Sequence, residues 1–365
     1  MNLKELSRRL GLSMTTVSRA LNGYSDVSPR TRERVVSMAR ELGYAPNATA
    51  RRLSSGRSET IGFVPQSLAA YYGNPYFADL LAGIGETLHA ANFDLVLACV
   101  PEGEAPLDVC RKLVEGRRVD GLILDRTFTA DPRVEYLAGR GFPFATLGRD
   151  RQAARHAFVD LDGERALEMA TMRLLELGHR EIAFIAADPR FNFVRERLAG
   201  YRRALARAGI VPRRELLRHD GFGEEAGARA ARALMRLRPR PTALLCIEDL
   251  TAIGAMRALR GLGLRPGREV SVIGYNDIPL ARVAEPPLST IRMPIRDAGR
   301  RLAAMVLALL DGADPGELQE IWEPELILRE SDGPPPDPAA AAEGAARIPL
   351  SAPPAAGRRG PRRPP

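Results

Sequence analysis

One short stretch of the chain carries polar side chains whose chemistry suits contact with a nucleic acid. The apolar spacing in Met14–Leu21 predicts a helix that buries Val17, Ala20 and Leu21. Its outward residues are then Thr15, Thr16, Ser18 and Arg19. Hydroxyl groups this short let a helix approach base edges closely, and an arginine reaches a phosphate or a guanine. The segment therefore predicts a helix that enters a DNA groove.

The distribution of charge points to the same partner. Residues 1–57 hold 11 Lys and Arg against 4 Asp and Glu, which accounts for +7 of the net charge of +8. A near-neutral body with a basic amino-terminal segment is typical of proteins that bind polyanions. A solvated basic face is the alternative, and charge alone does not separate the two.

The elements around Met14–Leu21 predict a compact headpiece. Asn2 is an N-cap for a helix with Leu3, Leu6 and Leu10 on one face, which Gly11 ends. Ser13 caps the next helix, and Ser28 with Pro29 starts a third that runs to Gly43. Three short helices with a tight turn between the first two predict a helix-turn-helix domain.

These residues resemble the headpiece of the lac repressor/galactose repressor family of bacterial transcriptional regulators. Three segments without gaps carry the resemblance: Met14–Gly23, Val27–Val35 and Leu42–Asn47. The resemblance continues to about residue 330. It implies a cytoplasmic homodimer that represses transcription from operator DNA under the control of a small-molecule effector. It also implies DNA contacts for a set of headpiece residues: Ser13, Met14, Thr15, Thr16, Ser18, Arg19, Asn22, Asn47 and Ala50.

Residues 47–58 form a linker that is too short to be a stable helix alone. In the similar family the corresponding segment is a hinge helix that orders when two subunits meet over the operator. The match puts Leu53 at the position of a leucine wedged into the minor groove, and Arg51 and Arg52 near phosphates. A plain interdomain linker is the alternative.

Residues 59–330 predict an α/β domain. Apolar runs bounded by turn residues are expected to be strands: Ile61–Val64, Leu95–Cys99, Gly121–Leu124, Phe144–Leu147, Ile182–Ala186, Ala243–Ile247 and Val270–Gly274. Amphipathic helices lie between most of them, for example Phe77–Ala91 and Gly163–Leu177. This alternation predicts doubly wound parallel sheets, and the length favours two lobes. The resemblance implies a periplasmic-binding-protein shape in which the chain crosses three times between the lobes.

Ligands of open α/β sheets bind beyond the carboxyl ends of the strands. There the resemblance implies an effector site made of Asn74, Tyr76, Phe77, Asp125, Phe158, Phe193, Arg197, Phe222, Glu248 and Asn276. Arg197 would fork onto ligand oxygens, because a planar guanidinium offers paired donors. Glu248 departs from the family's usual Asn, which favours a hydroxyl-rich or cationic effector over an anionic one.

Ordinary structural roles are the alternative for several of these residues. The aromatic residues Tyr76, Phe77, Phe193 and Phe222 would serve equally in a core, and Asp249 would serve as a helix cap. Asp160 matches a family position near the cleft, but with Asp162 it would also suit a helix start.

A sugar fits this mixture of acids, amides, one arginine and aromatic rings best, with a nucleoside or sugar phosphate as the alternatives. Three segments are also similar to regulators of α-glucoside uptake in this family: Asp125-Arg126-Thr127, Asp131-Pro132-Arg133 and Gly141-Phe142-Pro143-Phe144.

Enzymatic and exported classes fit the chain poorly. The four histidines, His89, His156, His179 and His219, have no metal-ligand spacing, and Gly83-Ile84-Gly85 lacks the third glycine of a dinucleotide motif. We therefore expect no enzyme activity, no cofactor and no metal. An exported solute-binding protein is the second reading of the body, but Met1–Leu10 lacks the apolar core of a signal peptide. No apolar window of membrane-spanning length is present.

Three cysteines in apolar settings, Cys99, Cys110 and Cys246, predict buried thiols in a reducing compartment. From Ser331 to Pro365 the composition changes, with 10 of the chain's 29 prolines. We predict a disordered tail there, without the leucine heptads of a tetramer-forming helix.

Overall fold

The computed structural model describes residues 2–21, 26–43, 57–66, 71, 73–101, 103–151 and 155–337. The chain divides into two compact units, Met1–Glu59 and Thr60–Pro365. We refer to them as the headpiece and the body.

The headpiece contains the three predicted helices: α1 (Leu3–Leu10), α2 (Met14–Leu21) and α3 (Pro29–Glu41). Each begins at the predicted cap, because the side chains of Asn2, Ser13 and Ser28 accept hydrogen bonds from backbone N–H groups of the first turn at 3.0, 3.0 and 3.3 Å. The apolar faces meet in a small core of Leu6, Leu10, Val17, Ala20, Val27, Val35 and Ala39.

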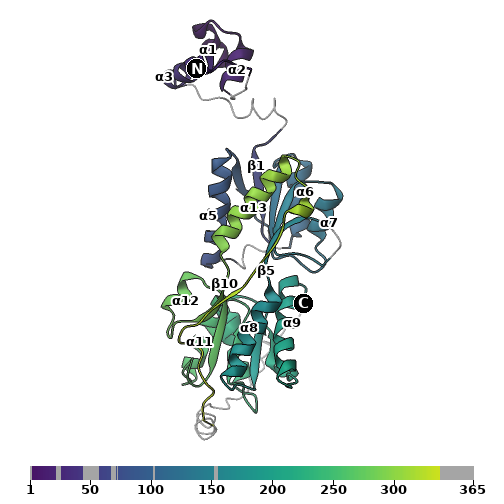
Figure 1. The fold of residues 1–365 in the computed structure, drawn as a ribbon, viewed down its shortest axis with the longest axis vertical. Helices are drawn as coiled ribbons and strands as arrows, with labels where there is room; N and C mark the ends of the chain where they lie inside the picture. Colours follow the sequence, from purple (N-terminus) through teal and green to yellow (C-terminus); the bar gives the residue numbers. More distant parts are fainter. Residues whose placement is uncertain are drawn as a thin grey trace, which may run out of the picture. The chain divides into compact units, whose positions relative to one another are not determined.

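The body holds two six-stranded sheets (Figure 1). The first has the strand order β11-β5-β4-β3-β1-β2. Its strands are β1 (Thr60–Val64), β2 (Asp94–Leu97), β3 (Gly121–Asp125), β4 (Phe144–Leu147), β5 (Ala157–Leu161) and β11 (Gln319–Trp322). Its helices are α5 (Pro75–Ala90), α6 (Pro106–Glu115), α7 (Pro132–Gly139) and α13 (Ile295–Leu310). We call this assembly lobe 1.

Lobe 2 surrounds the second sheet, of order β12-β10-β9-β8-β6-β7. Its strands are β6 (Ile182–Ala186), β7 (Leu217–His219), β8 (Ala243–Cys246), β9 (Ser271–Asn276), β10 (Ser289–Arg292) and β12 (Glu325–Ile327). Its helices are α8 (Gly163–Glu176), α9 (Asn192–Arg207), α10 (Gly223–Leu234), α11 (Asp249–Gly261) and α12 (Pro279–Val283). All strand pairs are parallel except β10 with β12.

Both lobes are three-layered because alternate strand residues face opposite helix layers. In lobe 1, Ile61 and Phe63 belong to the cluster with α5 and α13, whereas Val64 and Leu122 pack with α6 and α7. Lobe 2 follows the same rule between the layers α8–α9 and α10–α11. The predicted doubly wound α/β architecture with two lobes is confirmed.

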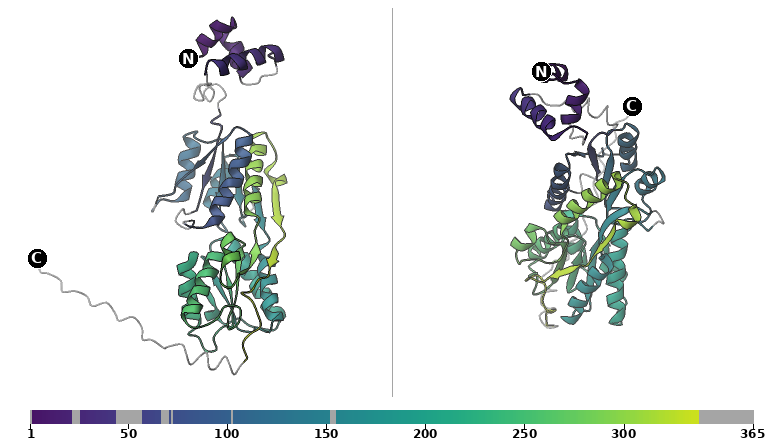
Figure 2. Two further views of the ribbon diagram at one scale, coloured as in Figure 1. Left: turned by 90° about the vertical axis from the view of Figure 1, so that its left-hand side faces the viewer. Right: turned by 45° about the horizontal axis from the view of Figure 1, so that its top comes forward.

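The chain passes between the lobes three times: after β5, after β10 and between β11 and β12. Figure 2 shows the carboxyl-terminal strands β11 and β12 continuing along one side of the body from lobe 1 into lobe 2. Because of these crossings the carboxyl ends of β3, β4 and β5 face those of β8, β9 and β10.

Glycines bring paired helices unusually close. A Cβ at Gly83 of α5 would collide with the carbonyl oxygen of Arg296 in α13, and one at Gly200 of α9 would collide with that of Glu164 in α8. Gly83 of the Gly83-Ile84-Gly85 sequence thus serves helix packing. Among the described residues, no helix combines the length and the apolar character that crossing a membrane requires.

The structure corrects several local expectations. Strand β2 lies at a sheet edge and leaves Val96 and Leu97 exposed, and Cys99 is exposed while Cys110 and Cys246 are buried. The strands β5, β7, β10, β11 and β12 were not predicted, because they are short or carry polar residues. At the start of the predicted tail, the hydroxyl of Ser331 donates to the carbonyl of Val272 at 2.6 Å, so the body continues past residue 330.

Candidate functional site

The exposed face of α2 carries the predicted DNA-contacting side chains. Met14 is 48 % exposed, and Thr15 and Arg19 are exposed as well. The hydroxyls of Ser13 and Thr16 hydrogen-bond to each other at 2.8 Å, and Arg19 forms an ion pair with Asp26 at 2.8 Å. Ser18 is half-buried beside them. The helix therefore presents a compact surface of hydroxyls and one guanidinium. The other predicted contacts lie outside the described residues: Asn22, Asn47, Ala50, Arg51 and Leu53.

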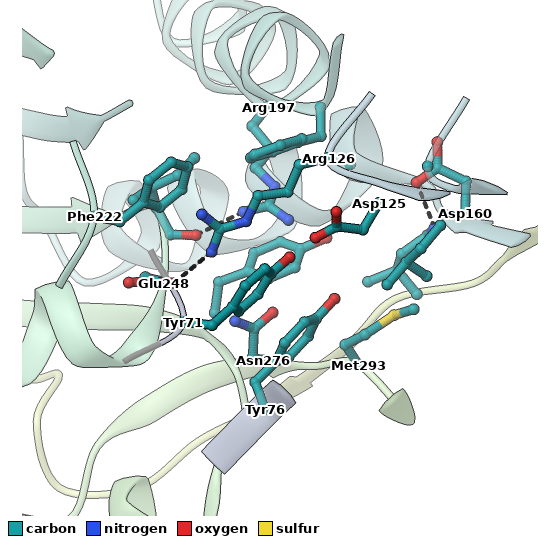
Figure 3. A pocket seen from close by; sticks show the side chains of 17 residues that line it. Tyr71, Tyr76, Asp125, Arg126, Asp160, Arg197, Phe222, Glu248, Asn276 and Met293 are labelled. Atoms are coloured by element: carbon teal, nitrogen blue, oxygen red, sulfur yellow. Dashed lines mark hydrogen bonds and ion pairs between the residues drawn. The ribbon is translucent and has the colours of Figure 1, made fainter. Parts of the chain in front are cut away.

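A pocket lies between the two lobes at the carboxyl ends of their strands (Figure 3). Its cavity measures about 80 Å³. Lobe 1 lines it with Tyr71, Tyr76, Asp125, Arg126, Leu147, Gly148, Asp160 and Leu161. Lobe 2 and the crossings add Gly163, Phe193, Arg197, Phe222, Ile247, Glu248, Tyr275, Asn276 and Met293.

Seven predicted effector residues line this pocket together: Tyr76, Asp125, Phe193, Arg197, Phe222, Glu248 and Asn276. Sequence reasoning did not assign Tyr71, Arg126, Tyr275 or Met293 to the site. Arg126 directly follows the predicted residue Asp125 at the end of β3, and Tyr275 directly precedes the predicted residue Asn276 on β9, which is the signal that would have found them. Tyr71 and Met293 stand in no comparable pattern.

Three predicted residues do not line the pocket. Asn74 caps α5, its side chain accepting from the N–H of Tyr76 at 3.1 Å. Phe77 stacks on Tyr71 with ring centroids 4.5 Å apart, and Phe158 packs against His156 at 5.7 Å. The core interpretation therefore fits Phe77, whose ring packs on Tyr71 and Phe63. Phe158 was predicted as an effector contact, but its buried ring packs against His156 instead.

Arg197 reaches the pocket from the first half of α9. Its Nη1 donates to the carbonyl of Ile247 at 2.6 Å, and its guanidinium carbon lies 3.3 Å from the ring centroid of Tyr275. Nε is buried and has no partner among the described residues. Burial raises the pKa of Tyr275 to about 12 although Arg197 acts to lower it. Arg197 is thus fixed in place with an unused donor.

Glu248 is the polar centre of the lobe 2 side. It is 4 % exposed, and it accepts from the backbone N–H of Gly223 at 2.9 Å and from the amide of Asn74 in lobe 1 at 3.4 Å. Arg126, also from lobe 1, approaches it at 3.8 Å. Burial raises the pKa of Glu248, and Arg126 is the largest opposing influence. Glu248 therefore joins the two lobes across the cleft.

A second carboxylate cluster lies at the end of β5. Arg149 in lobe 1 binds Glu196 of α9 at 2.8 Å and lies 3.7 Å from Asp160. Burial, reinforced by the nearby Glu196, raises the pKa of Asp160 to about 7. Near neutral pH the Asp160 side chain is therefore present both as a carboxylic acid, which donates a hydrogen bond, and as a carboxylate, which only accepts.

Buried hydrogen bonds from Arg133 hold the turn after β3 in place. Arg133 is fully buried and donates to Asp131 at 2.7 Å and to the backbone carbonyl of Asp125 at 2.9 Å. Asp125 accepts from the N–H of Gln66 at 3.0 Å, while its Oδ2 is buried and has no partner among the described residues. Burial raises the pKa of Asp125. The Asp131-Pro132-Arg133 segment therefore positions pocket residues without touching the cavity.

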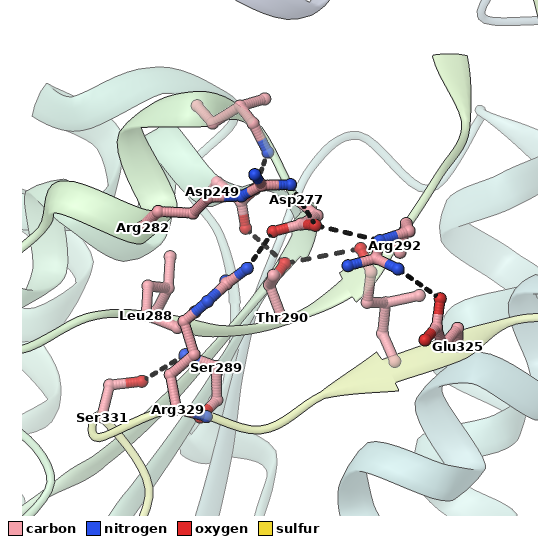
Figure 4. A network of polar contacts seen from close by, with 12 residues as sticks. Asp249, Asp277, Arg282, Leu288, Ser289, Thr290, Arg292, Glu325, Arg329 and Ser331 are labelled. Atoms are coloured by element: carbon pink, nitrogen blue, oxygen red, sulfur yellow. Dashed lines mark hydrogen bonds and ion pairs between the residues drawn. The ribbon is translucent and has the colours of Figure 1, made fainter. Parts of the chain in front are cut away.

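Asp249 and Asp277 hold the lobe 2 edge of the site together (Figure 4). Asp249 is buried and accepts from the N–H of Ile278 at 2.9 Å and from Thr290 at 2.6 Å, so it neither lines the pocket nor caps α11. Asp277 receives Arg292 at 3.0 Å and Arg329. Burial alone would raise the pKa of Asp277, but the guanidinium groups of Arg329 and Arg292 outweigh this effect and lower the pKa. The network fixes β9, whose last residues enter the pocket.

The pocket combines aromatic faces, carboxylate and amide acceptors, and two arginines. Such a set recognises a ring that carries hydroxyl groups on its edge and an apolar face. Within the described ranges, no group of three or more His, Cys, Asp or Glu side chains is arranged to hold a metal ion.

Comparison with known proteins agrees with this architecture. Residues 2–47 match the bacterial regulatory proteins of the lacI family, and residues 171–331 match the periplasmic binding protein-like domain. The HTH-type transcriptional regulator AglR of Rhizobium meliloti (strain 1021) is 38 % identical over 342 residues, which cover 92 % of this chain and 95 % of that relative.

Two solved structures cover 91 % of this chain and 99 % of their own. They are the complex of the transcriptional regulator CelR with cellobiose, at 32 % identity and a TM-score of 0.70, and the lac repressor dimer bound to operator and the anti-inducer ONPF, at 28 % and 0.78. These relatives confirm the prediction that the chain is a transcriptional regulator and not an enzyme. The chain belongs to the lacI family of bacterial regulatory proteins, and it is a DNA-binding transcriptional regulator.

Proposed function

We propose that this regulator is a cytoplasmic homodimeric repressor whose affinity for operator DNA is set by a sugar in the pocket between the lobes. The observation that carries the proposal is the pocket itself, where Phe222, Arg197, Glu248 and Asn276 meet at the carboxyl ends of the strands. Carboxylate and amide acceptors take hydroxyl protons, Arg197 supplies donors, and the aromatic ring covers an apolar sugar face.

On DNA, two headpieces dock in successive major grooves of a near-palindromic operator. The exposed side chains of α2, Met14, Thr15 and Arg19 among them, contact bases and phosphates. Residues 47–58 order in the minor groove, with Leu53 as the wedge. Sugar binding changes the angle between the lobes and so the distance between the headpieces. A coupling of about 1–3 kcal/mol would change operator affinity about 5- to 150-fold.

Among sugars we propose an α-glucoside. The similarity to regulators of α-glucoside uptake falls partly on Asp125 and Arg126, which line the pocket, and partly on Asp131 and Arg133, which brace them. Fluorescence anisotropy of labelled DNA from upstream of the protein's own gene tests this. Maltose, sucrose or trehalose should shift operator affinity more than cellobiose or glucose; a larger shift with cellobiose would contradict the α-linkage.

Arg197→Ala separates ligand recognition from DNA binding. The variant should keep operator affinity and lose the response to the sugar, because Arg197 supplies hydrogen-bond donors to the ligand. Arg202→Ala, an exposed arginine on the same helix, is the matched control and should behave like the wild type. Simultaneous loss of both activities in Arg197→Ala would show that this side chain is structural.

Leu53→Ala tests the hinge. A wedge contributes to the bent specific complex, so the variant should weaken operator binding more than binding to random duplex. Equal losses on both duplexes would leave residues 47–58 as a plain linker.

A further inference from the structure

Arg126 occupies the part of the pocket where a ligand ring would stack. Its guanidinium carbon lies 4.4 Å from the ring centroid of Tyr71 and 4.0 Å from that of Phe222. Figure 3 shows the side chain reaching between these two rings toward Glu248. We call the space between Tyr71 and Phe222 the aromatic slot. In this structure the protein fills the slot with its own side chain.

The contact crosses the cleft. Tyr71 and Arg126 belong to lobe 1, whereas Phe222 and Glu248 belong to lobe 2. Oε2 of Glu248 is 3.8 Å from the Arg126 guanidinium, and the two side chains are only 5 % and 11 % exposed. A buried carboxylate needs a cation or hydrogen-bond donors, because desolvation otherwise disfavours its charge. Arg126 supplies that cation while the slot holds no ligand.

The backbone around Arg126 holds it in this position. Arg126 has a φ of 46°, in the left-handed region that residues other than glycine rarely adopt. Immediately after it, the N–H of Thr129 donates to Arg190 at 2.9 Å and the N–H of Asn192 donates to Thr127 at 3.1 Å, which joins the turn to lobe 2. Such a costly backbone conformation persists where surrounding contacts over-determine it.

The filled slot leaves too little room for a sugar. The cavity of about 80 Å³ compares with roughly 300–1,000 Å³ for the pockets of small-molecule ligands. The Arg126 guanidinium lies over both the Tyr71 ring and the Phe222 ring. Its displacement opens the aromatic faces on which a sugar ring would stack.

We propose that Arg126 is a built-in occupant of the aromatic slot, which an effector must displace while supplying Glu248 with donor groups in its place. The proposal rests on the proposed effector function and narrows the ligand class. The ligand must carry an apolar ring face together with hydroxyl or ammonium donors next to it. A phosphate or carboxylate at that position would meet Glu248 and is excluded.

Removing the occupant should leave a vacant cation site. In Arg126→Gly the left-handed φ costs less, and the slot loses its guanidinium. Methylguanidinium chloride, followed by thermal shift and isothermal titration calorimetry, should then bind saturably at millimolar concentration to this variant and not to the wild type. Arg126→Ala is the second variant and should behave alike.

Two controls define the site. In the double variant Arg126→Gly with Glu248→Gln, the binding of methylguanidinium should disappear, because the carboxylate that binds it has been removed. Arg265→Ala removes an exposed arginine that pairs with Glu269 at 2.8 Å; methylguanidinium should not bind this variant saturably, because the site is open to water. Folded Arg126→Gly and Arg126→Ala proteins that show no methylguanidinium binding would overturn the proposal.

The affinity for a sugar, measured for the wild type and for Arg126→Gly, is an independent test of the proposal. The sugar must compete with the state in which Arg126 occupies the slot. The cation–π and ion-pair contacts that stabilise this state lower the apparent affinity for the sugar about 5- to 30-fold. Maltose or cellobiose, whichever binds the wild type, should therefore bind Arg126→Gly tighter by about that factor. Weaker binding would make Arg126 a ligand contact and would overturn the proposal. If methylguanidinium binds Arg126→Gly but no sugar binds either protein, the role of Arg126 as occupant of the slot is supported and the proposal of a sugar effector is refuted.

Discussion

The headpiece and the pocket of the body carry their functional groups in opposite ways. In the headpiece these groups are exposed or half-buried and lie on or next to one helix, α2, over a core of residues such as Leu6 and Val17. In the pocket they are buried, charged and drawn from segments between residues 71 and 293. A surface made for a polyanion can stay solvated until its partner arrives, whereas a site for a small molecule must hold desolvated charges in advance.

This difference predicts how substitutions act. Exposed side chains of α2 should affect binding with little change in stability, because they make few contacts in the free protein. Pocket residues such as Arg197 and Asp160 should affect binding and stability together, because they also contact neighbouring groups of the folded protein: Arg197 the carbonyl of Ile247, and Asp160 the guanidinium of Arg149.

The salt dependence of the two binding events should separate them most strongly. Operator affinity should fall by about 10³-fold or more between about 50 and 200 mM salt, because phosphate contacts release counterions. Binding of a neutral sugar in the pocket should barely change over the same range. Anisotropy for DNA and calorimetry for the sugar measure both, and similar slopes would remove the contrast.

The Leu6→Ala substitution should break only the headpiece. Leu6 is fully buried in that core, and a buried leucine cut to alanine typically costs about 2–5 kcal/mol. Operator binding should be lost while sugar binding is kept. Leu174→Ala, equally buried in α8 of the body, is the control and should lower the melting temperature of the body. Loss of sugar binding in Leu6→Ala would mean that the two units do not fold independently.

Asp160→Asn should change how the stability of the body depends on pH. The pKa of Asp160 is raised to about 7, so the folded state holds a proton that the unfolded state has lost, and stability falls as pH rises from about 4 to 7. The variant should flatten that fall, as thermal melts between pH 5 and 8 would show. Asp188→Asn is the control. Arg190 lowers the pKa of Asp188, so this variant should lose a constant amount of stability above about pH 4 and change the pH dependence only below that pH. An unchanged profile in Asp160→Asn would contradict the assignment.

Ser28→Ala should have the smallest effect. The hydroxyl of Ser28 accepts from the N–H of Thr31 at the start of α3, and loss of such a cap costs about 0.5–2 kcal/mol. Thermal melts of the headpiece should show a modest drop, with operator affinity at low temperature nearly unchanged. A loss as large as that of Leu6→Ala would mean that Ser28 does more than cap a helix.

The same contrast explains which expectations succeeded. The helices of the headpiece were predicted with their caps because Asn2, Ser13 and Ser28 act within one turn of sequence. The strands β1, β3 and β4 were predicted because they are buried on both faces and read as apolar runs. Edge strands such as β7 and β12 have no such pattern, because only one neighbour pairs with them.

Within the pocket, the resemblance brought together Arg197, Glu248 and Asn276, whose positions follow from strand ends. It did not distinguish Phe77 from Phe222, because both are aromatic residues at the start of a helix that follows a strand, and only packing decides which side each one faces. The contact of Arg126 with Tyr71 and Phe222 joins residues far apart in sequence, and no local pattern contains it.

The sequence by itself determined the three helices of the headpiece, its charge, the doubly wound plan of the body and the family, because caps, periodicity and composition act over short distances along the chain. Only the tertiary structure decided which side chains face the cavity, that the pKa of Asp160 is raised to about 7, and that Arg126 fills the aromatic slot. Those properties arise from burial and from charges that the folded chain brings together across the cleft, and neither exists until the lobes have formed.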